Sequence, residues 1–469
     1  MSIFFDDLGC YGDRAALIGG AGELFTFGEL VDNSSLIAAS VPSRSFVFLV
    51  CQNHPVCVFA YVGFLRKRVV PLLLNYTISD GQLLRLIGVY LPSYIFIQRD
   101  RVSDFLGDYV EVGGFLGGYV LLCRRDGFCP LLYDELGLVL TTSGSTGSPR
   151  LVRLSYQNIQ INTESIIDYL NITADERAIT TMPMSYSYGL SIINTHLCAG
   201  GSIIMTDLTL MDRGFWNLFN EFLPTTFGGV PYIYEMLRKL RFGRMRLSGL
   251  RYLTQAGGHL SAELVGEFRD ICAGKSIRFV VMYGQTEATA RMSYLPFDKS
   301  YEKAGSIGIP IPNGQFKLED EEGNIINSAE SAGELVYYGP NVSLGYAEEM
   351  SDLAKEDENG GVLKTGDIAK RDSDGYYYII GRKKRFLKIF GNRINLDEVD
   401  QILKNAGYDA ITTGKDDQLK IFTTQNCEDK IKSLLTEQLK LNQSAFKIQL
   451  IKNIPRNDNG KILYNNLPE

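Results

Sequence analysis

The chain has 469 residues and a formal net charge of −7, with 45% apolar and 22% charged residues. This length exceeds the size at which one hydrophobic core stops growing, so we expect two or three domains in an ordinary soluble globular protein. A net negative charge does not indicate a basic surface for binding nucleic acid, and we expect no nucleic-acid partner.

Cysteine spacing and the length of the apolar runs indicate the cellular compartment and whether the chain crosses a membrane. The eight cysteines are scattered, with no CxxC pair and no short-spaced metal set, and the first seven residues lack the basic segment of a secretory signal. Apolar runs such as 46–51 have the length of a strand and are too short to cross a bilayer. We therefore expect no membrane span, and reduced thiols in a cytoplasmic protein.

Strands and helices alternate along the first hundred residues. We expect strands over 45–51, 69–74 and 94–97, and helices over 54–68 and 79–90. This alternation predicts parallel sheets with helices on both faces.

Further along the chain, 201–205 and 278–282 are buried-strand candidates, and strand-rich segments such as 333–338 and 376–380 follow. We therefore expect an α/β protein with a large N-terminal domain of parallel-sheet αβ subdomains plus a β-rich subdomain.

The basic run Arg382–Arg385 interrupts the strand-rich region, and a small α+β region follows it. We expect this run to be a hinge with a solvated basic face. Segment 409–424 leaves little room for strands. The simplest division is an N-terminal domain over 1–382 and a small mobile C-terminal lid over 383–469.

The loop that follows the apolar run 136–140 is the most informative local feature of the chain. Glycine backbone and hydroxyl side chains supply N–H and O–H donors for phosphate oxygens, although such clusters also form ordinary loops. The Gly-Lys-Ser/Thr ending of the kinase and GTPase P-loop is missing. The candidate phosphate-binding residues are Thr142, Ser143, Gly144, Ser145, Thr146, Gly147 and Arg150.

Together with three later stretches, this loop resembles the signature of the AMP-forming acyl-CoA synthetases, adenylation domains and luciferases. The later stretches stand in the family's order at 283–287, at 365–367 continuing to Gly381–Arg382, and at 455–461. The resemblance runs from about residue 12 to Lys461. It implies binding of ATP and Mg²⁺ and formation of an acyl-adenylate, with the C-terminal region as a mobile lid.

The resemblance assigns roles around the nucleotide. Tyr283, followed by Gly284, stacks on adenine; Thr286 donates to the α-phosphate; and Glu287 coordinates magnesium. One carboxylate plus ATP phosphates suits the preference of magnesium for oxygen ligands. Because 278–282 is a predicted strand, this motif lies where ligands bind in open α/β sheets, at the carboxyl end of a strand.

Three further residues complete the catalytic assignment. Asp367 accepts hydrogen bonds from the ribose hydroxyls, and Arg382 approaches the ribose from the other side. Activating a carboxylate needs no protein base, because the nucleophile is already anionic; the site supplies alignment and positive charge. Lys461, in the lid, offers its ammonium to the carboxylate and the α-phosphate.

Two departures from the family pattern bear on the substrate. Arg150 stands where the family usually has Lys, which keeps the charge and changes its geometry. Tyr186 stands where many acyl- and aryl-CoA synthetases have His. Its neighbour Ser187 replaces the Asp that pairs with the amine in amino-acid-activating relatives, which disfavours a simple α-amino acid.

The acyl pocket is predicted from the same resemblance, with Tyr186, Gly257, Gly258 and His259 bordering it. No counter-ion for a charged substrate is evident in these segments. An uncharged, apolar or hydroxylated acid therefore suits them best.

The second half-reaction implied by the resemblance is thioester formation. Lys384 occupies the hinge position, and the segment around Gly391 resembles the part that lines the thiol tunnel. The acceptor is coenzyme A or, alternatively, a phosphopantetheinyl acyl carrier protein; amino-acid adenylation and a non-catalytic nucleotide-binding relative are the remaining alternatives. The oligomeric state, the acid and the choice of thiol stay open.

Overall fold

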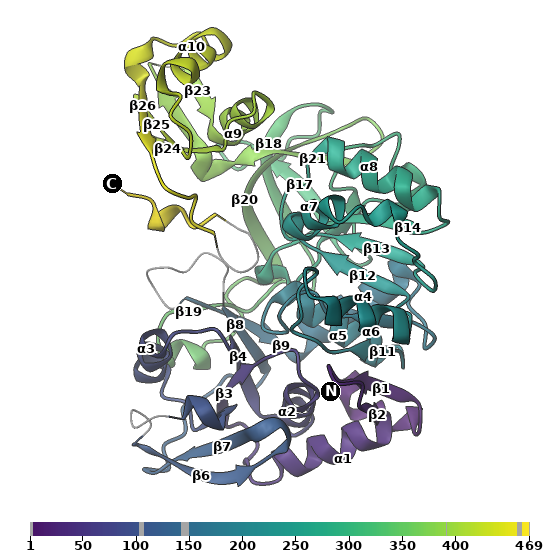
Figure 1. Cartoon of the computed structure of the whole chain (residues 1–469). Coiled ribbons are helices and arrows are strands. Elements are labelled where there is room, and N and C mark those ends of the chain that lie inside the picture. The colour runs from purple at the N-terminus through teal and green to yellow at the C-terminus, as the bar shows by residue number, and fades with distance from the viewer. Residues whose placement is uncertain (1–2, 103–106, 142–149, 391, 457–461, 469) are drawn as a thin grey trace. The chain divides into compact units, whose positions relative to one another are not determined.

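The computed structural model describes residues 3–102, 107–141, 150–390, 392–456 and 462–468 (Figure 1). The chain divides into two compact units. Unit 1 comprises Met1–Gln315 and Tyr337–Leu363, and unit 2 comprises Phe316–Val336 and Lys364–Glu469. No helix in the described ranges is long and apolar enough to cross a membrane.

Unit 1 contains a nine-stranded sheet whose strands from β14 to β1 are parallel and whose two ends are antiparallel. Its strands in spatial order are β16 (Ile309–Pro310), β15 (Ser293–Tyr294), β14 (Arg278–Tyr283), β13 (Tyr252–Gln255), β12 (Thr226–Gly229), β10 (Arg177–Ile179), β11 (Ser202–Ile204), β1 (Ala15–Ile18) and β2 (Leu24–Thr26).

An eight-stranded sheet forms the rest of the β structure of unit 1. Four neighbouring strands are parallel, and the strands at the two ends of the sheet pair antiparallel. In spatial order they are β19 (Gly345–Ala347), β9 (Leu151–Ser155), β8 (Leu136–Thr141), β4 (Val70–Asn75), β3 (Phe46–Cys51), β5 (Tyr94–Gln98), β7 (Tyr119–Arg124) and β6 (Tyr109–Gly114).

Helices cover these sheets (Figure 1), and four of them contribute to one core that both sheets share. Every residue over 55–65 in α2 is buried, as a helix that is apolar all round requires. That core also holds residues of α5 and of the strands β3 and β11. The helices of unit 1 are α1 (Phe27–Ala38), α2 (Pro55–Arg66), α3 (Asp80–Tyr90), α4 (Tyr156–Leu170), α5 (Ser187–Cys198), α6 (Arg213–Phe222), α7 (Pro231–Lys239) and α8 (Ala262–Ala273).

Unit 2 contains most of one four-stranded sheet. It also contains a two-stranded sheet, a three-stranded sheet and two helices. A separate core of apolar side chains from α9, α10 and the C-terminal strands stabilises its last part. The elements are β17 (Gln315–Glu319), β18 (Ala332–Tyr338), β20 (Val362–Arg371), β21 (Tyr377–Arg382), β22 (Phe386–Ile389), β23 (Asn392–Asn395), α9 (Leu396–Asn405), β24 (Ala410–Lys415), β25 (Gln418–Thr423), α10 (Glu428–Leu439) and β26 (Phe446–Leu450).

The α/β fold class is confirmed, and the predicted strands and helices of the first hundred residues are present as β3, α2, β4, α3 and β5. The expectation for 409–424 is wrong, because β24 and β25 form an antiparallel hairpin there. A left-handed Asp417, with φ of 63°, makes the tight turn that lets this short segment hold two strands. The predicted boundary between residues 382 and 383 separates the N-terminal domain from a mobile lid, and it stays a prediction.

Candidate active site

The predicted phosphate loop joins two paired strands of unit 1. Residues Thr142 to Gly147 lie outside the described residues, so their assignment stays a prediction. Thr141 of β8 pairs with Leu151 of β9, so the ends of the loop meet at the edge of a buried hairpin. Arg150, the last residue of the predicted loop, is described.

Arg150 lies against Tyr346 of β19. Its guanidinium carbon is 3.6 Å from the centre of the Tyr346 ring, and its Nε is 3.3 Å from Glu348 Oε1. The Arg150 side chain is half exposed, at 49%. A planar guanidinium stacks on an aromatic face in a way that an ammonium does not, so the departure from Lys gives this position a fixed protein contact.

Glu287 is held by the same tyrosine. The Tyr346 hydroxyl donates a 2.8 Å hydrogen bond to Glu287 Oε1. Burial raises the pKa of Tyr346, and the nearby Glu287 charge adds to that rise, so this hydroxyl remains a donor. Tyr346 is not among the predicted site residues, because nothing in the local sequence around it indicates a contact with a carboxylate 59 positions away.

The motif 283–287 lies at the carboxyl end of β14, as predicted. Thr286 begins a 3₁₀ turn over Thr286–Ala288, and its Oγ1 is 3.1 Å from the Oγ of Ser187 at the start of α5. At Gly284 an added Cβ would lie 1.9 Å from the carbonyl oxygen of Ala290. Only glycine permits this close approach of two backbone segments.

Glu287 fits a magnesium ion that also takes phosphate oxygens. Its second carboxylate oxygen has no hydrogen-bond partner among the described residues. In the described part of the chain no group of three or more His, Cys, Asp or Glu side chains could hold a metal by itself. A magnesium site here would therefore need oxygen ligands from the nucleotide, which is how this ion is usually bound.

The predicted acyl-pocket residues are partly brought together. The Tyr186 hydroxyl faces Gly257, where an added Cβ would lie 2.6 Å from it, and Gly257 has a φ of +79°. An added Cβ at Gly258 would instead meet the Pro231 ring at 3.1 Å. His259 is exposed.

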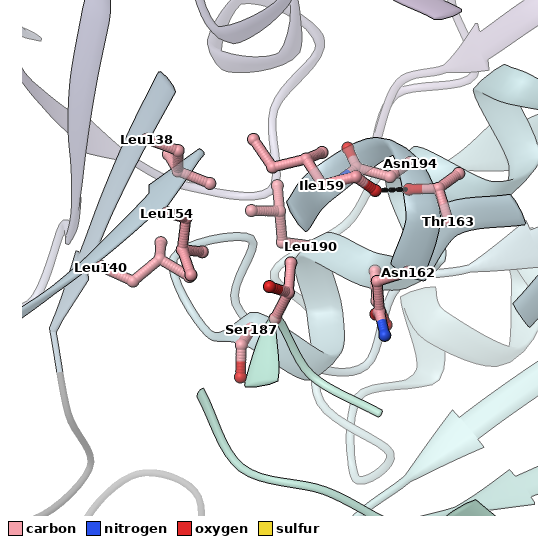
Figure 2. A pocket seen from close by; sticks show the side chains of 11 residues that line it. Leu138, Leu140, Leu154, Ile159, Asn162, Thr163, Ser187, Leu190 and Asn194 are labelled. Atoms are coloured by element: carbon pink, nitrogen blue, oxygen red, sulfur yellow. Dashed lines mark hydrogen bonds between the residues drawn. The ribbon is translucent and has the colours of Figure 1, made fainter. Parts of the chain in front are cut away.

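A small pocket lies beside the Thr286 turn. Figure 2 shows that β8, β9, α4 and α5 supply its walls, and Ser187, which contacts Thr286, is one of them. Its apolar side is formed by Leu138, Leu140, Leu154, Ile159 and Leu190, and its polar side includes Asn162, Thr163, Ser187 and Asn194.

Asp367 and Arg382 pair in unit 2. They are opposite each other in the β20–β21 ladder, and Arg382 Nε is 3.0 Å from Asp367 Oδ1. The Asp367 side chain is 4% exposed and that of Arg382 is 54% exposed. Gly366, with a φ of +70°, lies within β20 directly before Asp367, whose amide donates to Thr365 Oγ1.

The basic run is less solvated than predicted. Lys383 Nζ lies 2.7 Å from Glu334 Oε2, and Arg385 Nε lies 2.6 Å from Asp397 Oδ1. The Arg385 side chain is only 13% exposed, and its guanidinium also faces the Tyr464 ring at 4.7 Å. The expectation of a solvated face is therefore wrong at Arg385, because acidic residues of α9 fold over it.

The remaining predicted residues belong to the C-terminal part of the chain. Lys384 lies in the 3₁₀ turn Lys383–Arg385, between β21 and β22. Gly391 and Lys461 lie outside the described residues. Their roles, and that of Lys384, stay predictions.

Sequence analysis also missed Arg291. Its side chain is 2% exposed, and its guanidinium carbon lies 3.9 Å from the centre of the Tyr188 ring. A charged residue five positions after Thr286 gives no signal in sequence that it will be buried, since arginines are mostly exposed.

Thr286, in contact with Ser187, and Glu287, in contact with Tyr346, thus follow the carboxyl end of β14, the edge at which ligands bind in open α/β sheets. Residues 129–347 match the family of AMP-binding enzymes. Together with the relatives described below, this match identifies the chain as an AMP-forming ligase.

Known relatives agree with this placement. Indoleacetate–CoA ligase of Aromatoleum aromaticum is 26% identical over 388 residues, covering 79% of this chain and 75% of the relative. Feruloyl-CoA synthase of an Amycolatopsis species is 29% identical over 280 residues, covering 58% of this chain and 55% of the relative.

Solved structures share the fold. The o-succinylbenzoate CoA synthetase of Bacillus subtilis, in complex with its acyl-adenylate, matches with a TM-score of 0.83 at 21% identity, covering 100% of this chain and 98% of that one. A second structure of that synthetase, with ATP and a magnesium ion, has a TM-score of 0.80 at the same identity and covers 100% and 99% of the two chains.

Proposed function

We propose that this protein is an AMP-forming acid–thiol ligase that joins a carboxylic acid to coenzyme A. A carboxylate oxygen attacks the α-phosphorus of ATP, the bond to the bridging oxygen breaks, and pyrophosphate leaves with that electron pair. The thiol of coenzyme A, losing its proton, then attacks the acyl carbon and AMP leaves. The first step needs alignment and positive charge rather than a base, because the nucleophile is anionic.

The observation that carries the proposal is the contact between Thr286 and Ser187. When Ser187 donates to Thr286 Oγ1 across 3.1 Å, the Thr286 hydrogen is left for another acceptor. A hydroxyl oriented in this way suits an α-phosphate oxygen whose charge grows during attack. Because Thr286 lies in a short turn and contacts Ser187, its hydroxyl is held in place and needs little reorganisation during the reaction.

Glu287, positioned by Tyr346, and Asp367, paired with Arg382, supply the contacts proposed for magnesium and ribose. Bound with ATP, magnesium would neutralise phosphate charge. ATP and Mg²⁺ are accordingly the cofactors of the proposed reaction, as ATP and magnesium are present in the related synthetase.

The alternatives receive less support. A carrier protein as acceptor would need a docking surface, and the basic run offers little charge because its described members pair with carboxylates. An amino acid would need a carboxylate where Ser187 stands, and Ser187 is engaged with Thr286. A non-catalytic relative would not need to retain Thr286 and Glu287 together.

We also propose a cytoplasmic location, with residues 383–469 moving as a lid about Lys384. All eight cysteines are described, and each is a free thiol, which suits a reducing compartment. Lys384 lies in a turn between two strands, where a few residues can absorb a rotation.

Two measurements test the proposed function. ATP–pyrophosphate exchange over a panel of carboxylic acids measures the first half-reaction, and thioester formation with coenzyme A or with holo carrier protein measures the second. We expect acid-dependent exchange and a CoA thioester. ATP binding without exchange for any acid would contradict the proposal, and thioester formed only on the carrier protein would favour the alternative acceptor.

A further inference from the structure

Arg291 is a buried cation without a counter-ion. In the described part of the chain its guanidinium forms no salt bridge, and its Nε is buried with no hydrogen-bond partner. The phosphate loop at 142–149, which is not described, contains no acidic residue that could serve as one. Burying a charge is costly, and stacking on the Tyr188 ring offsets only part of that cost. An anion, which the described residues do not supply, would offset the rest.

The backbone around Arg291 is strained and firmly held. Thr289 and Ala290 have φ values of +59° and +119°, conformations that residues with side chains rarely adopt. The carbonyl oxygen of Arg291 accepts 3.0 Å hydrogen bonds from the side-chain amides of Asn162 and Asn341. Strain of this kind persists where the surroundings impose it, and it is concentrated at functional sites. The fold therefore fixes the position from which the Arg291 side chain projects.

The guanidinium carbon lies 3.9 Å from the centre of the Tyr188 ring, and that ring centre is 6.4 Å from the ring centre of Tyr186, a predicted acyl-pocket residue. Burial raises the pKa of Tyr169, Tyr186 and Tyr188, and the positive charge of Arg291 partly counteracts that rise for all three hydroxyl groups. Tyr188 is hydrogen-bonded to Thr254, and Tyr169 is hydrogen-bonded to the Met282 sulfur and to the Arg291 guanidinium.

Tyr186, by contrast, has a hydroxyl with no hydrogen-bond partner among the described residues. It faces Gly257, where an added Cβ would lie 2.6 Å away. Arg291 and Tyr186 thus offer donors on one side of the predicted pocket, and no carboxylate of the described residues is bonded to either.

We propose that Arg291 binds a second carboxylate of the substrate, so that the acid activated by this enzyme is a dicarboxylic acid. The inference rests on the proposed function and narrows its substrate class. The planar guanidinium can donate two parallel hydrogen bonds to one carboxylate. The Tyr186 hydroxyl is a third donor on the same side of the predicted pocket. The reacting carboxylate is the other one, directed to the nucleotide beside Thr286.

This proposal revises the sequence-based expectation of an uncharged acid. That expectation was drawn from the segments around Tyr186 and Gly257, in which no counter-ion for a charged substrate is evident. Arg291 belongs to neither segment. A buried guanidinium would also repel the ammonium of an α-amino acid, which agrees with the serine at position 187.

The test compares matched substrates. ATP–pyrophosphate exchange is measured with succinate, glutarate and phthalate and with the monomethyl ester of each, for the wild type, Arg291→Met and Arg291→Lys. We expect the wild type to prefer the free diacid by about 10- to 100-fold in kcat/KM, the size of one charge-assisted contact. Arg291→Met should abolish that preference and retain exchange with the monoesters, and Arg291→Lys should restore part of it.

Arg278→Met is the matched control. Arg278 also lies over a tyrosine of the same apolar cluster, 5.3 Å from the Tyr252 ring centre, but it donates to the Leu170 carbonyl. This variant should keep the wild-type preference. Thermal unfolding of each variant separates loss of fold from loss of selectivity.

The outcomes separate the two proposals. Equal use of diacid and monoester by the wild type, or a preference that Arg291→Met leaves intact, would overturn the role of Arg291 and leave the adenylation reaction standing. Absence of exchange with any acid, while ATP still binds, would overturn the proposed function and this inference with it.

Discussion

Tyr346 and Glu287 are joined by a 2.8 Å hydrogen bond across 59 positions of sequence. Tyr346 lies in β19, which pairs with β9, and β9 begins directly after Arg150. The tyrosine therefore contacts Arg150 with its ring and Glu287, the proposed magnesium ligand, with its hydroxyl. We regard Tyr346 as a positioning residue for Glu287.

The first prediction concerns this pair. Tyr346→Phe removes the donor and frees the carboxylate to rotate, so the magnesium concentration for half-maximal exchange should rise by about tenfold or more, as for other partners of metal ligands. ATP affinity measured by calorimetry without magnesium should change little. Tyr90→Phe, which removes a 2.8 Å hydrogen bond to the Ala347 carbonyl beside Tyr346, is the control and should leave the magnesium requirement unchanged.

The second prediction concerns the nucleotide ribose. Asp367→Ala should weaken ATP and AMP alike by about 1.5–3 kcal/mol, the value of a charge-assisted hydrogen bond. Arg382, which would lose its partner, is 54% exposed and stays hydrated, so the fold should persist. Glu334→Gln disrupts the Lys383 ion pair of the same sheet and should not alter nucleotide affinity. Unchanged calorimetric affinity in Asp367→Ala would remove the ribose assignment.

The third prediction concerns Lys461, which the sequence motif at 455–461 assigns to the first half-reaction. Lys461→Ala should slow adenylate formation by about 10²–10³-fold, the usual loss for one preorganised electrostatic contact. Thioester formation from supplied acyl-adenylate should survive. An equal loss in both half-reactions would argue against a lid with two arrangements.

The fourth prediction concerns the hinge. Lys384→Pro fixes φ near −65° within the turn Lys383–Arg385 and restricts the preceding residue. We expect nearly normal pyrophosphate exchange and loss of thioester formation, because the lid would be held in the adenylating arrangement. Wild-type thioester formation by this variant would place the hinge elsewhere.

The fifth prediction concerns acid stability. Burial lowers the pKa of His196 to about 4, and its Nε2 has no hydrogen-bond partner among the described residues. Between pH 6.5 and 4 the unfolded chain binds a proton there that the native protein does not, so the free energy of unfolding falls as pH falls, by at most about 1.4 kcal/mol per pH unit.

His196→Leu removes this contribution. Urea unfolding at pH 7, 6 and 5 should show a smaller acid-induced loss of stability in the variant than in the wild type, with parallel behaviour above pH 7. An identical pH dependence for the two proteins would mean that the pKa of His196 is the same in the native and unfolded states.

Much of the fold could be predicted from local sequence pattern. Apolar runs bounded by polar turns predicted β3, β4 and β5, and the position of 283–287 after a strand placed Thr286 and Glu287 at the correct edge of a sheet. The β24–β25 hairpin was missed because its tight turn at Asp416–Asp417 lacks glycine, the usual turn signal.

The sequence by itself determined the α/β class, the order of the motifs and the chemistry for which Thr286 and Glu287 are suited, because these depend on residue type and short-range spacing. Only the tertiary structure decided which side chains meet. Tyr346 reaches Glu287 through strand pairing, and Arg291 is buried against Tyr188 through packing of a strained turn on Gly284. Burial and long-range pairing arise from the whole fold, and for this reason the two residues that refine the site could not be found in the sequence.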